Sequence, residues 1–256
     1  MTPLLQVRGI EKHFGARIGC ADVSFDLYPG EVMGIVGESG SGKSTLLNCL
    51  AGHLTPDCGQ VIFDTRAEGP VDTVTMPEPA RRMLARTDWA FVRQNPRDGL
   101  RMNVSAGGNI GERLMAVGAR HYGGIRGRAL DWLDRVEISR ARVDDRPDSF
   151  SGGMQQRLQI ARNLVTGPRL VFMDEPTGGL DVSVQARLLD LLRGLVRRMG
   201  LSAVIVTHDL AVVRLLADRL MVMKDGRVVE SGLTDQVLDD PRHAYTQLLV
   251  SSVLLL

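Results

Sequence analysis

The sequence predicts an α/β protein with a mostly parallel core sheet, an antiparallel β part and a helical part. Short apolar runs at 170–173 and 203–206, each preceded by a helical pattern, are typical of strands buried on both faces of a parallel sheet. Alternation of apolar and polar residues near the N-terminus indicates antiparallel strands. Residues 97–150 carry no strand pattern, so we expect them to add helices beside the sheet.

The N-terminal elements follow from this alternation and from turn residues. Alternating patterns over 4–10 and 23–27 predict two strands, and Tyr28-Pro29-Gly30 predicts the turn after them. The continuous apolar run 32–36 predicts a buried strand, and the spacing of apolar residues over 44–50 predicts a helix. A strand, a short loop and a helix therefore follow one another directly.

The rest of the chain is expected to alternate between helices and strands. The stretch 64–86, rich in Pro and acidic residues, predicts a loop with a short helix before a strand at 89–93. A helix is expected around 129–136, and leucines three and four residues apart predict another over 182–199. Residues 220–230, with an Asp-Gly pair in the middle, predict a hairpin.

Composition excludes several classes of protein. Of the 256 residues, 44% are hydrophobic and 24% are charged, which is typical of a soluble globular protein. The net charge of +1, from 31 basic and 30 acidic residues, gives no overall field for nucleic acid or anionic lipid. The three cysteines lack metal-ligand spacing and suit a reducing compartment. No apolar run is long enough to span a bilayer, so we expect a cytoplasmic protein without direct membrane insertion.

The segment GESGSGKST, from Gly37 to Thr45, matches the phosphate-binding loop (P-loop) pattern between the expected strand and helix. Lys43 would reach the β- and γ-phosphates, and the Ser44 hydroxyl would bind Mg²⁺. Backbone N–H groups at the helix N-terminus would face the phosphates. A glycine-rich turn without ligand is the alternative, and Lys43 and Ser44 at these offsets argue against it. The candidate binding residues are Gly37, Ser39, Gly40, Ser41, Gly42, Lys43, Ser44 and Thr45.

The segment RLVFMDE ends an apolar strand with two carboxylates, Asp174 and Glu175. One can hold Mg²⁺ and the other can orient or deprotonate the attacking water, because phosphoryl transfer needs positioning and charge stabilisation. We assign Asp174 to the metal and Glu175 to the water. Alone, such a pair typically begins a solvated loop, but the upstream P-loop favours the catalytic interpretation.

The segment SGGMQQR, just before that strand, resembles the signature loop of ATP-binding cassette (ABC) ATPases. Further motifs of this family follow in the family's order: Phe14, Gln94 in FVRQNP, Asp181 in GGLD and His208 in VIVTHDL. The resemblance covers essentially the whole chain and implies an ATPase that uses ATP and Mg²⁺. It also implies one domain, with a nucleotide-binding core at 1–96 and 166–256 and a helical signature subdomain at 97–165.

The resemblance implies a role for each of these residues. Phe14 would stack on adenine, Gln94 would reach both Mg²⁺ and the attacking water, and His208 would sense the γ-phosphate. Without the other motifs, Phe14 would be assigned to the core, and Gln94 and His208 to ordinary surface or core positions. Asp181 would belong to the loop that approaches the second subunit.

The family also implies an ATP-dependent homodimer. Ser151, Gly152 and Gly153 would bind the γ-phosphate held by the P-loop of a second subunit, since they begin a helix whose N-terminus attracts anions. One departure concerns Gly178 and Gly179, which replace the family's frequent Ser-Ala. The loss of the serine hydroxyl puts the usual contact of this loop across the dimer in doubt. Phe150 and Met154 also stand where the family often has Leu and Gln.

Segments of the chain resemble two different subfamilies of ABC ATPases. The tail DPRHAYTQLL resembles the ATPases of oligopeptide and nickel importers, so an importer subunit, for phosphonates or for such substrates, is the alternative. The segments 98–126 and 150–211 resemble the ATP-binding proteins of bacterial carbon–phosphorus lyase systems, the interpretation we favour. It implies docking as a homodimer on the lyase core in organic phosphonate breakdown, beside a second, related ABC protein. No tandem ATPase domain, long coiled coil or basic arm indicates a nucleic-acid partner.

The segment 98–126 is also the expected docking surface, because it carries the subfamily resemblance and follows Gln94. We expect Arg113 and Arg120 to be exposed charges on it. The alternative is that its glycines only shape a surface loop.

Overall fold

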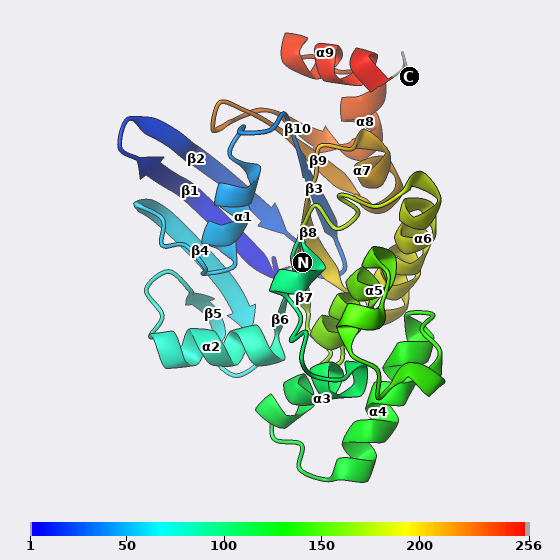
Figure 1. Ribbon diagram of the computed structural model, residues 1–256. Helices are drawn as coiled ribbons and strands as arrows, with labels where there is room; N and C mark the ends of the chain where they lie inside the picture. The colour runs from blue at the N-terminus through cyan, green and yellow to red at the C-terminus, as the bar shows by residue number, and fades with distance from the viewer. Residues whose placement is uncertain (1, 254–256) are drawn as a thin grey trace. The chain divides into compact units, whose positions relative to one another are not determined.

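The computed structural model describes residues 2–253, and Figure 1 traces the chain. The chain forms two compact units. Unit 1 contains Met1–Arg81 and Gly200–Leu256, and unit 2 contains Arg82–Met199. No helix among residues 2–253 is long and apolar enough to cross a membrane.

The first sheet of unit 1 is antiparallel, in the order β2-β1-β4-β5, as the blue and cyan strands of Figure 1 show. Val7 of β1 pairs with Phe25 of β2 on one side and with Val61 of β4 on the other, and all three side chains are buried. This apolar face therefore holds the sheet onto the core of the unit. Its strands are β1 (Leu5–Phe14), β2 (Arg17–Leu27), β4 (Cys58–Thr65) and β5 (Gly69–Asp72).

The second group of strands in unit 1 is mostly parallel. β3 (Val32–Val36) lies between β8 (Ser202–Val206) and β9 (Arg219–Lys224) and is parallel to both, and β10 (Arg227–Leu233) returns antiparallel to β9. Every residue of β3 and β8 is buried, as expected when helices cover a parallel sheet. The helices of this unit are α1 (Lys43–Leu50), α7 (Leu210–Leu216), α8 (Thr234–Asp239) and α9 (Ala244–Val253).

Unit 2 joins a parallel pair of strands to a group of helices. β6 (Trp89–Val92) pairs with β7 (Leu170–Asp174), and the Trp89 and Phe172 rings meet edge to face at 5.5 Å. Helix α2 (Glu78–Thr87) begins in unit 1 and ends in unit 2. The other helices of unit 2 are α3 (Ala106–Ala116), α4 (Tyr122–Arg135), α5 (Gly152–Leu164) and α6 (Val182–Met199), with short 3₁₀ turns at Pro96–Asp98, Arg140–Arg142 and Pro147–Ser149.

The structure confirms the fold class and the main elements. The buried strand at 32–36, the helix at 182–199 and the hairpin around Asp225-Gly226 lie where the sequence predicts them. The three cysteines are free thiols, two buried and one exposed. The division into 1–96 with 166–256 and a helical subdomain at 97–165 stays a prediction.

The prediction for the stretch between α1 and β6 was incomplete. The short helix expected within 64–86 is present as α2, but strand β5 in the same stretch was missed. β4 was missed as well. The apolar run Val61-Ile62-Phe63 is short and has polar residues on both sides, which hides a strand that pairs with β1 and with β5.

Helix α3 was missed because its sequence contains glycines that lower helix propensity. The structure shows what they permit. A Cβ on Gly107 would lie 2.6 Å from a Val143 methyl, and one on Gly111 would lie 2.8 Å from an Ile125 methyl of α4. Close packing of α3 therefore outweighs the propensity of its sequence.

Candidate nucleotide site

The P-loop of unit 1 lies between β3 and α1, as predicted. Lys43 is the first residue of α1, and its side chain is buried. Its ammonium donates hydrogen bonds to the carbonyl oxygens of Gly37 and Glu38, each at 2.7 Å, and lies 3.4 Å from the Ser41 hydroxyl. The loop backbone therefore fixes the position of the charge that the P-loop pattern assigns to the phosphates.

Two glycines allow this loop to pack tightly. The φ angle is +153° at Gly37 and +101° at Gly42, a region that favours glycine. A Cβ on Gly37 would lie 2.2 Å from the Met223 carbonyl oxygen, and a Cβ on Gly42 would lie 2.0 Å from the Gly19 carbonyl oxygen. Any side chain at either position would displace backbone, so the glycines of the motif are needed here for space as well as for conformation.

His208 lies in the segment that follows β8. The Thr207 N–H donates to the Ile35 carbonyl at 3.1 Å, which continues the parallel pairing of β8 with β3 up to this point. Because carboxyl ends of adjacent parallel strands meet at one edge of a sheet, His208 and the P-loop follow their strands at the same edge of the sheet. The His208 side chain is exposed.

Phe14 is the last residue of β1, and its ring is 51% exposed. The alternative that Phe14 belongs to the core is therefore wrong. A Cβ on Gly19 would lie 2.9 Å from the Phe14 ring and 2.8 Å from the Thr45 methyl, so the ring lies beside the first turn of α1. An exposed aromatic face next to the P-loop fits a base-stacking role.

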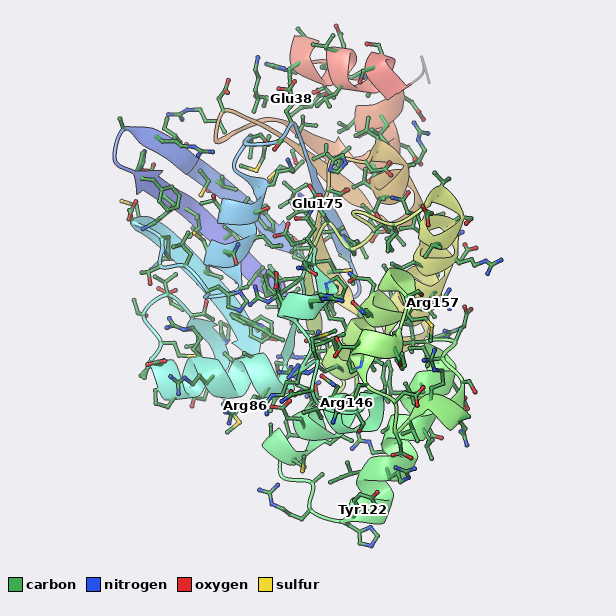
Figure 2. All side chains as sticks on the ribbon, viewed as in Figure 1. Glu38, Arg86, Tyr122, Arg146, Arg157 and Glu175 are labelled. Atoms are coloured by element: carbon green, nitrogen blue, oxygen red, sulfur yellow. The ribbon has the colours of Figure 1, made fainter. Side chains whose placement is uncertain are left out.

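Unit 2 brings Gln94 and Glu175 together. Gln94 follows β6 and Glu175 follows β7, and the Gln94 amide nitrogen donates to Glu175 Oε2 at 2.9 Å. Figure 2 labels Glu175 where the chain leaves β7. Its φ of +43° lies in the left-handed region, where a non-glycine residue costs about 1–3 kcal/mol. Such strain is typical of residues held for function.

Gly178, where the family often has serine, lies close to Gln94 and Glu175. A Cβ there would lie 3.4 Å from both Gln94 Nε2 and Glu175 Oε2, and 3.3 Å from the Glu175 carbonyl oxygen. Position 178 therefore borders the Gln94–Glu175 pair directly. Asp181 follows, and its carbonyl accepts hydrogen bonds from the N–H groups of Val184 and Gln185, both at 2.9 Å, at the start of α6.

The signature residues begin helix α5. The Ser151 hydroxyl caps the helix by accepting a long hydrogen bond of 3.4 Å from the Met154 N–H. Gly152 and Gly153 form the first turn, and a Cβ on Gly153 would lie 2.5 Å from a Val184 methyl. Phe150, one of the family departures, is buried with the Arg142 guanidinium 4.4 Å from its ring centre. Phe150 therefore contributes to packing and is not exposed at the candidate site.

Two buried glutamines that the sequence interpretation missed connect this helix to the catalytic segments. Gln159 Oε1 accepts a hydrogen bond from the Arg93 N–H at 2.6 Å, and its amide donates to the Arg93 carbonyl at 3.2 Å. The Gln156 amide donates to the carbonyls of Arg93 and Pro176 at 3.3 and 3.0 Å. Arg93 precedes Gln94 and Pro176 follows Glu175. A signal was present in the sequence, since the amides of Gln156, Gln159 and Asn163 recur at helical spacing on one face of α5.

The residues assigned to Mg²⁺ supply the oxygen donors that this ion prefers: the Ser44 hydroxyl, the Asp174 carboxylate and the Gln94 amide oxygen. The bond from the Gln94 amide nitrogen to Glu175 turns its carbonyl oxygen away from that carboxylate. Among residues 2–253, no group of three or more His, Cys, Asp or Glu side chains is arranged so that it could hold a metal ion by itself. Oxygen donors of this kind suit an ion that takes few protein ligands and shares substrate phosphates.

Comparison with known protein families agrees with this geometry. The family model described as "ABC transporter" matches residues 20–178, which include the P-loop, the signature and the two carboxylates Asp174 and Glu175. The chain therefore belongs to the ABC family of ATP-binding proteins, and it binds and hydrolyses ATP.

Comparison with individual proteins shows which ABC proteins this chain is similar to. The chain is 67% identical over 252 residues, 98% of both chains, to the putative phosphonates utilization ATP-binding protein PhnK of Escherichia coli K12. It is 40% identical to the peptidoglycan transport ATP-binding protein YejF of Agrobacterium fabrum, over 98% of this chain and 47% of that protein. A solved structure, the dimeric ATP-binding cassette MJ0796 bound to ADP and Pi, matches with a TM-score of 0.80 at 30% identity, over 90% of this chain and 98% of that one.

Proposed function

We propose that this chain is the ATPase subunit that docks, as a homodimer, on a carbon–phosphorus lyase core during organic phosphonate catabolism in the cytoplasm. The observation that carries the proposal is the 67% identity, over 98% of both chains, to a protein named for phosphonates utilization. The resemblance of 98–126 and 150–211 to lyase-system proteins is consistent with it. By the same resemblance, a second, related ABC protein meets the chain on the core.

In the proposed mechanism, the residues of the chain position water and stabilise charge on ATP. Lys43 and the P-loop amides hold the phosphates, Phe14 stacks on adenine, and His208 contacts the γ-phosphate. Glu175 orients and deprotonates the attacking water, and the hydrogen bond from Gln94 fixes its carboxylate. This bond is the feature of unit 2 that best supports a catalytic role for Glu175.

We propose that Ser44, Asp174 and Gln94 hold Mg²⁺. When bound, the ion neutralises charge that develops on the β- and γ-phosphates. The chain would supply oxygen ligands to the ion, while the Gln94 amide nitrogen donates its hydrogen bond to Glu175.

We further propose that two chains complete each ATP site. Ser151, Gly152 and Gly153 begin a 13-residue helix, and such an N-terminus attracts a phosphate. The dimeric state of the matched cassette MJ0796 supports self-association. Asp181, exposed at the start of α6, belongs to the loop that approaches the partner.

The proposed docking surface is the segment 98–126. It exposes Met115 (47%), Val117 (38%) and Tyr122 (71%), and exposed apolar side chains that gather on one segment favour a protein partner. Figure 2 shows Tyr122 at the outer end of the helices of unit 2. This arrangement argues against the alternative that the glycines there only shape a loop.

One residue expected on this surface does not belong to it. Arg113 is largely buried, and its guanidinium donates to the Ala85 carbonyl at 2.8 Å, which ties α3 to α2. Burial lowers the pKa of Arg113. The expectation of an exposed charge there is wrong, because the long side chain folds back over the neighbouring helix. Arg120 is exposed, as predicted.

Co-purification tests the proposed partner. An affinity-tagged chain, expressed in cells that grow on a phosphonate, should recover soluble lyase subunits. Arg120→Glu together with Tyr122→Glu should weaken this recovery without changing ATP hydrolysis, whereas the reversal Arg66→Glu, in unit 1, should leave it unchanged. Equal recovery with all variants would place the docking surface elsewhere on the chain.

The second candidate is the ATPase subunit of an importer. The 40% identity to a transport ATP-binding protein and the tail DPRHAYTQLL favour it. The same co-purification separates the two functions, because an importer subunit would recover membrane permeases instead of soluble lyase subunits.

A further inference from the structure

The C-terminal helix contacts the phosphate-binding loop through one tyrosine. Tyr245, on α9, accepts a hydrogen bond on its hydroxyl from the backbone N–H of Glu38, at an N–O distance of 3.0 Å. Figure 2 shows Glu38 next to α9. Glu38 is the second residue of the P-loop, and more than 200 residues of sequence separate it from Tyr245. The bond lies entirely within unit 1.

The peptide between Gly37 and Glu38 is thereby held from both sides. Its carbonyl oxygen, on Gly37, accepts a hydrogen bond from the Lys43 ammonium at 2.7 Å. Its N–H, on Glu38, donates to Tyr245. Because a peptide is planar, its N–H and its carbonyl turn together. The Tyr245 hydroxyl therefore fixes the direction of a carbonyl that holds the ammonium of Lys43.

Other C-terminal elements support the same loop. The Gly226 N–H, in the turn between β9 and β10, donates to the Ser41 carbonyl at 3.0 Å. The Met223 carbonyl of β9 packs against Gly37 so closely that a Cβ there would lie 2.2 Å from it. Tyr245 thus adds the contact from α9 to a loop that β9 and its turn already confine.

The surroundings of Tyr245 keep its hydroxyl at Glu38. The ring is 5% exposed and packs in a cluster that includes Val36, the last residue of β3 before the P-loop. The Lys224 ammonium lies 5.0 Å from the ring centre. Burial raises the pKa of Tyr245, which keeps the hydroxyl protonated.

Hydrogen bonds also fix the position of the N-terminal end of α9. The Glu230 carboxylate, on β10, accepts hydrogen bonds from the N–H groups of Arg242 and His243 at 2.8 and 3.0 Å. The Tyr245 N–H donates to the His243 ring nitrogen at 3.1 Å. These contacts define the position of Tyr245 independently of its hydroxyl.

We propose that Tyr245 is a positioning residue for ATP binding: its hydroxyl orients the Gly37–Glu38 peptide and, through it, Lys43. The segment from Glu230 to α9 thereby sets the affinity of the P-loop for nucleotide phosphates. This role concerns the ATPase itself and holds whichever partner the chain serves.

Tyr245→Phe tests the proposal, since it keeps the buried ring and removes only the hydroxyl. It should raise the Kd for both ATP and ADP by about 3- to 10-fold, the factor that one ordinary hydrogen bond contributes. The matched control is Tyr28→Phe, which makes the same chemical change at a partly exposed turn of unit 1. A second control, Val229→Ala, loosens packing against the same cluster without touching the hydroxyl.

The melting temperature and the two Kd values, measured on the purified chain by calorimetry, separate positioning from packing. The proposal predicts a raised Kd in Tyr245→Phe alone, with both controls at the wild-type Kd and a lower melting temperature in Val229→Ala. An unchanged Kd in Tyr245→Phe overturns it, whether or not the melting temperature falls. A Kd that rises equally in Val229→Ala also overturns it, because packing alone would then explain the effect.

Discussion

Replacing Gln159 by leucine tests the connection between the signature helix and the catalytic residues of unit 2. Gln159 is fully buried, and its amide oxygen accepts the Arg93 N–H at 2.6 Å. Leucine has a similar volume but cannot accept a hydrogen bond. The Arg93 carbonyl keeps the Gln156 amide at 3.3 Å as its donor, but Gln156 Oε1 loses the Gln159 amide that donates to it at 3.1 Å. The substitution therefore leaves one buried N–H and one buried amide oxygen without these partners.

Each buried group left unsatisfied costs about 1–3 kcal/mol, and for a domain of this size each kcal/mol lowers the melting temperature by roughly 2–4 °C. For the two groups together we expect a decrease of roughly 4–24 °C. Because Arg93 directly precedes Gln94, we also expect kcat for ATP hydrolysis to fall on the order of 10-fold, since small misplacements of catalytic groups are costly. The Kd for ATP should stay unchanged, because the P-loop belongs to unit 1.

Melting curves and steady-state hydrolysis at saturating ATP measure both effects. Gln236→Leu, at an exposed position of α8, is the matched control and should change neither quantity. If Gln159→Leu lowers the melting temperature but leaves kcat unchanged, the glutamine only stabilises the fold and the reasoning about Gln94 fails.

Three further predictions concern the catalytic residue, the composite site and pH. Glu175→Gln should slow hydrolysis by roughly 10²- to 10⁴-fold and trap an ATP-bound dimer, which measurements of turnover and of mass in solution would detect. Turnover at the wild-type rate would show that Glu175 does not act on the attacking water. Mixing Lys43→Ala with Ser151→Arg chains should restore part of the activity, since one site of each mixed dimer stays intact; no recovery would contradict a site shared by two chains. Burial alone would raise the pKa of Glu230, but the nearby Thr246 hydroxyl and two backbone N–H groups hold it below its usual value. The stabilising effect of Glu230 is therefore complete above the unfolded-state pKa, about 4.3, and is lost as the pH falls further. Glu230→Gln should therefore reduce the decrease in melting temperature between pH 5 and pH 3. Parallel curves of melting temperature against pH for the variant and the wild type would refute this prediction.

The sequence predicted the parts of the site that depend on local chain direction. A P-loop, a strand ending in Asp174 and Glu175, and a histidine after β8 are each short segments whose geometry follows from a strand and the turn after it. The elements that were not predicted from the sequence depend on contacts with residues distant in the chain. β4 pairs with the distant β1 as well as with β5, and α3 forms because Gly107 and Gly111 let Val143 and Ile125 approach.

Contacts between buried polar groups were also beyond the sequence. Nothing in the residues around Arg113 indicates that its guanidinium reaches the Ala85 carbonyl, and nothing near Tyr245 indicates a bond to Glu38. Such contacts depend on which side chains the fold brings within about 3 Å, a distance that local patterns do not specify. Gln94 and Glu175, by contrast, follow two neighbouring parallel strands, so their 2.9 Å contact agrees with the roles that the motifs assign.

The central claim is that ATP binding by this chain is coupled to a carbon–phosphorus lyase core. The most direct test measures the Kd of the wild-type chain for a purified lyase core with and without ATP, and the Kd for ATP with and without the core. Coupling requires both affinities to change by the same factor, which is typically about 5- to 150-fold. The account predicts a measurable complex whose affinity changes with ATP. No binding to the core in either state would contradict it.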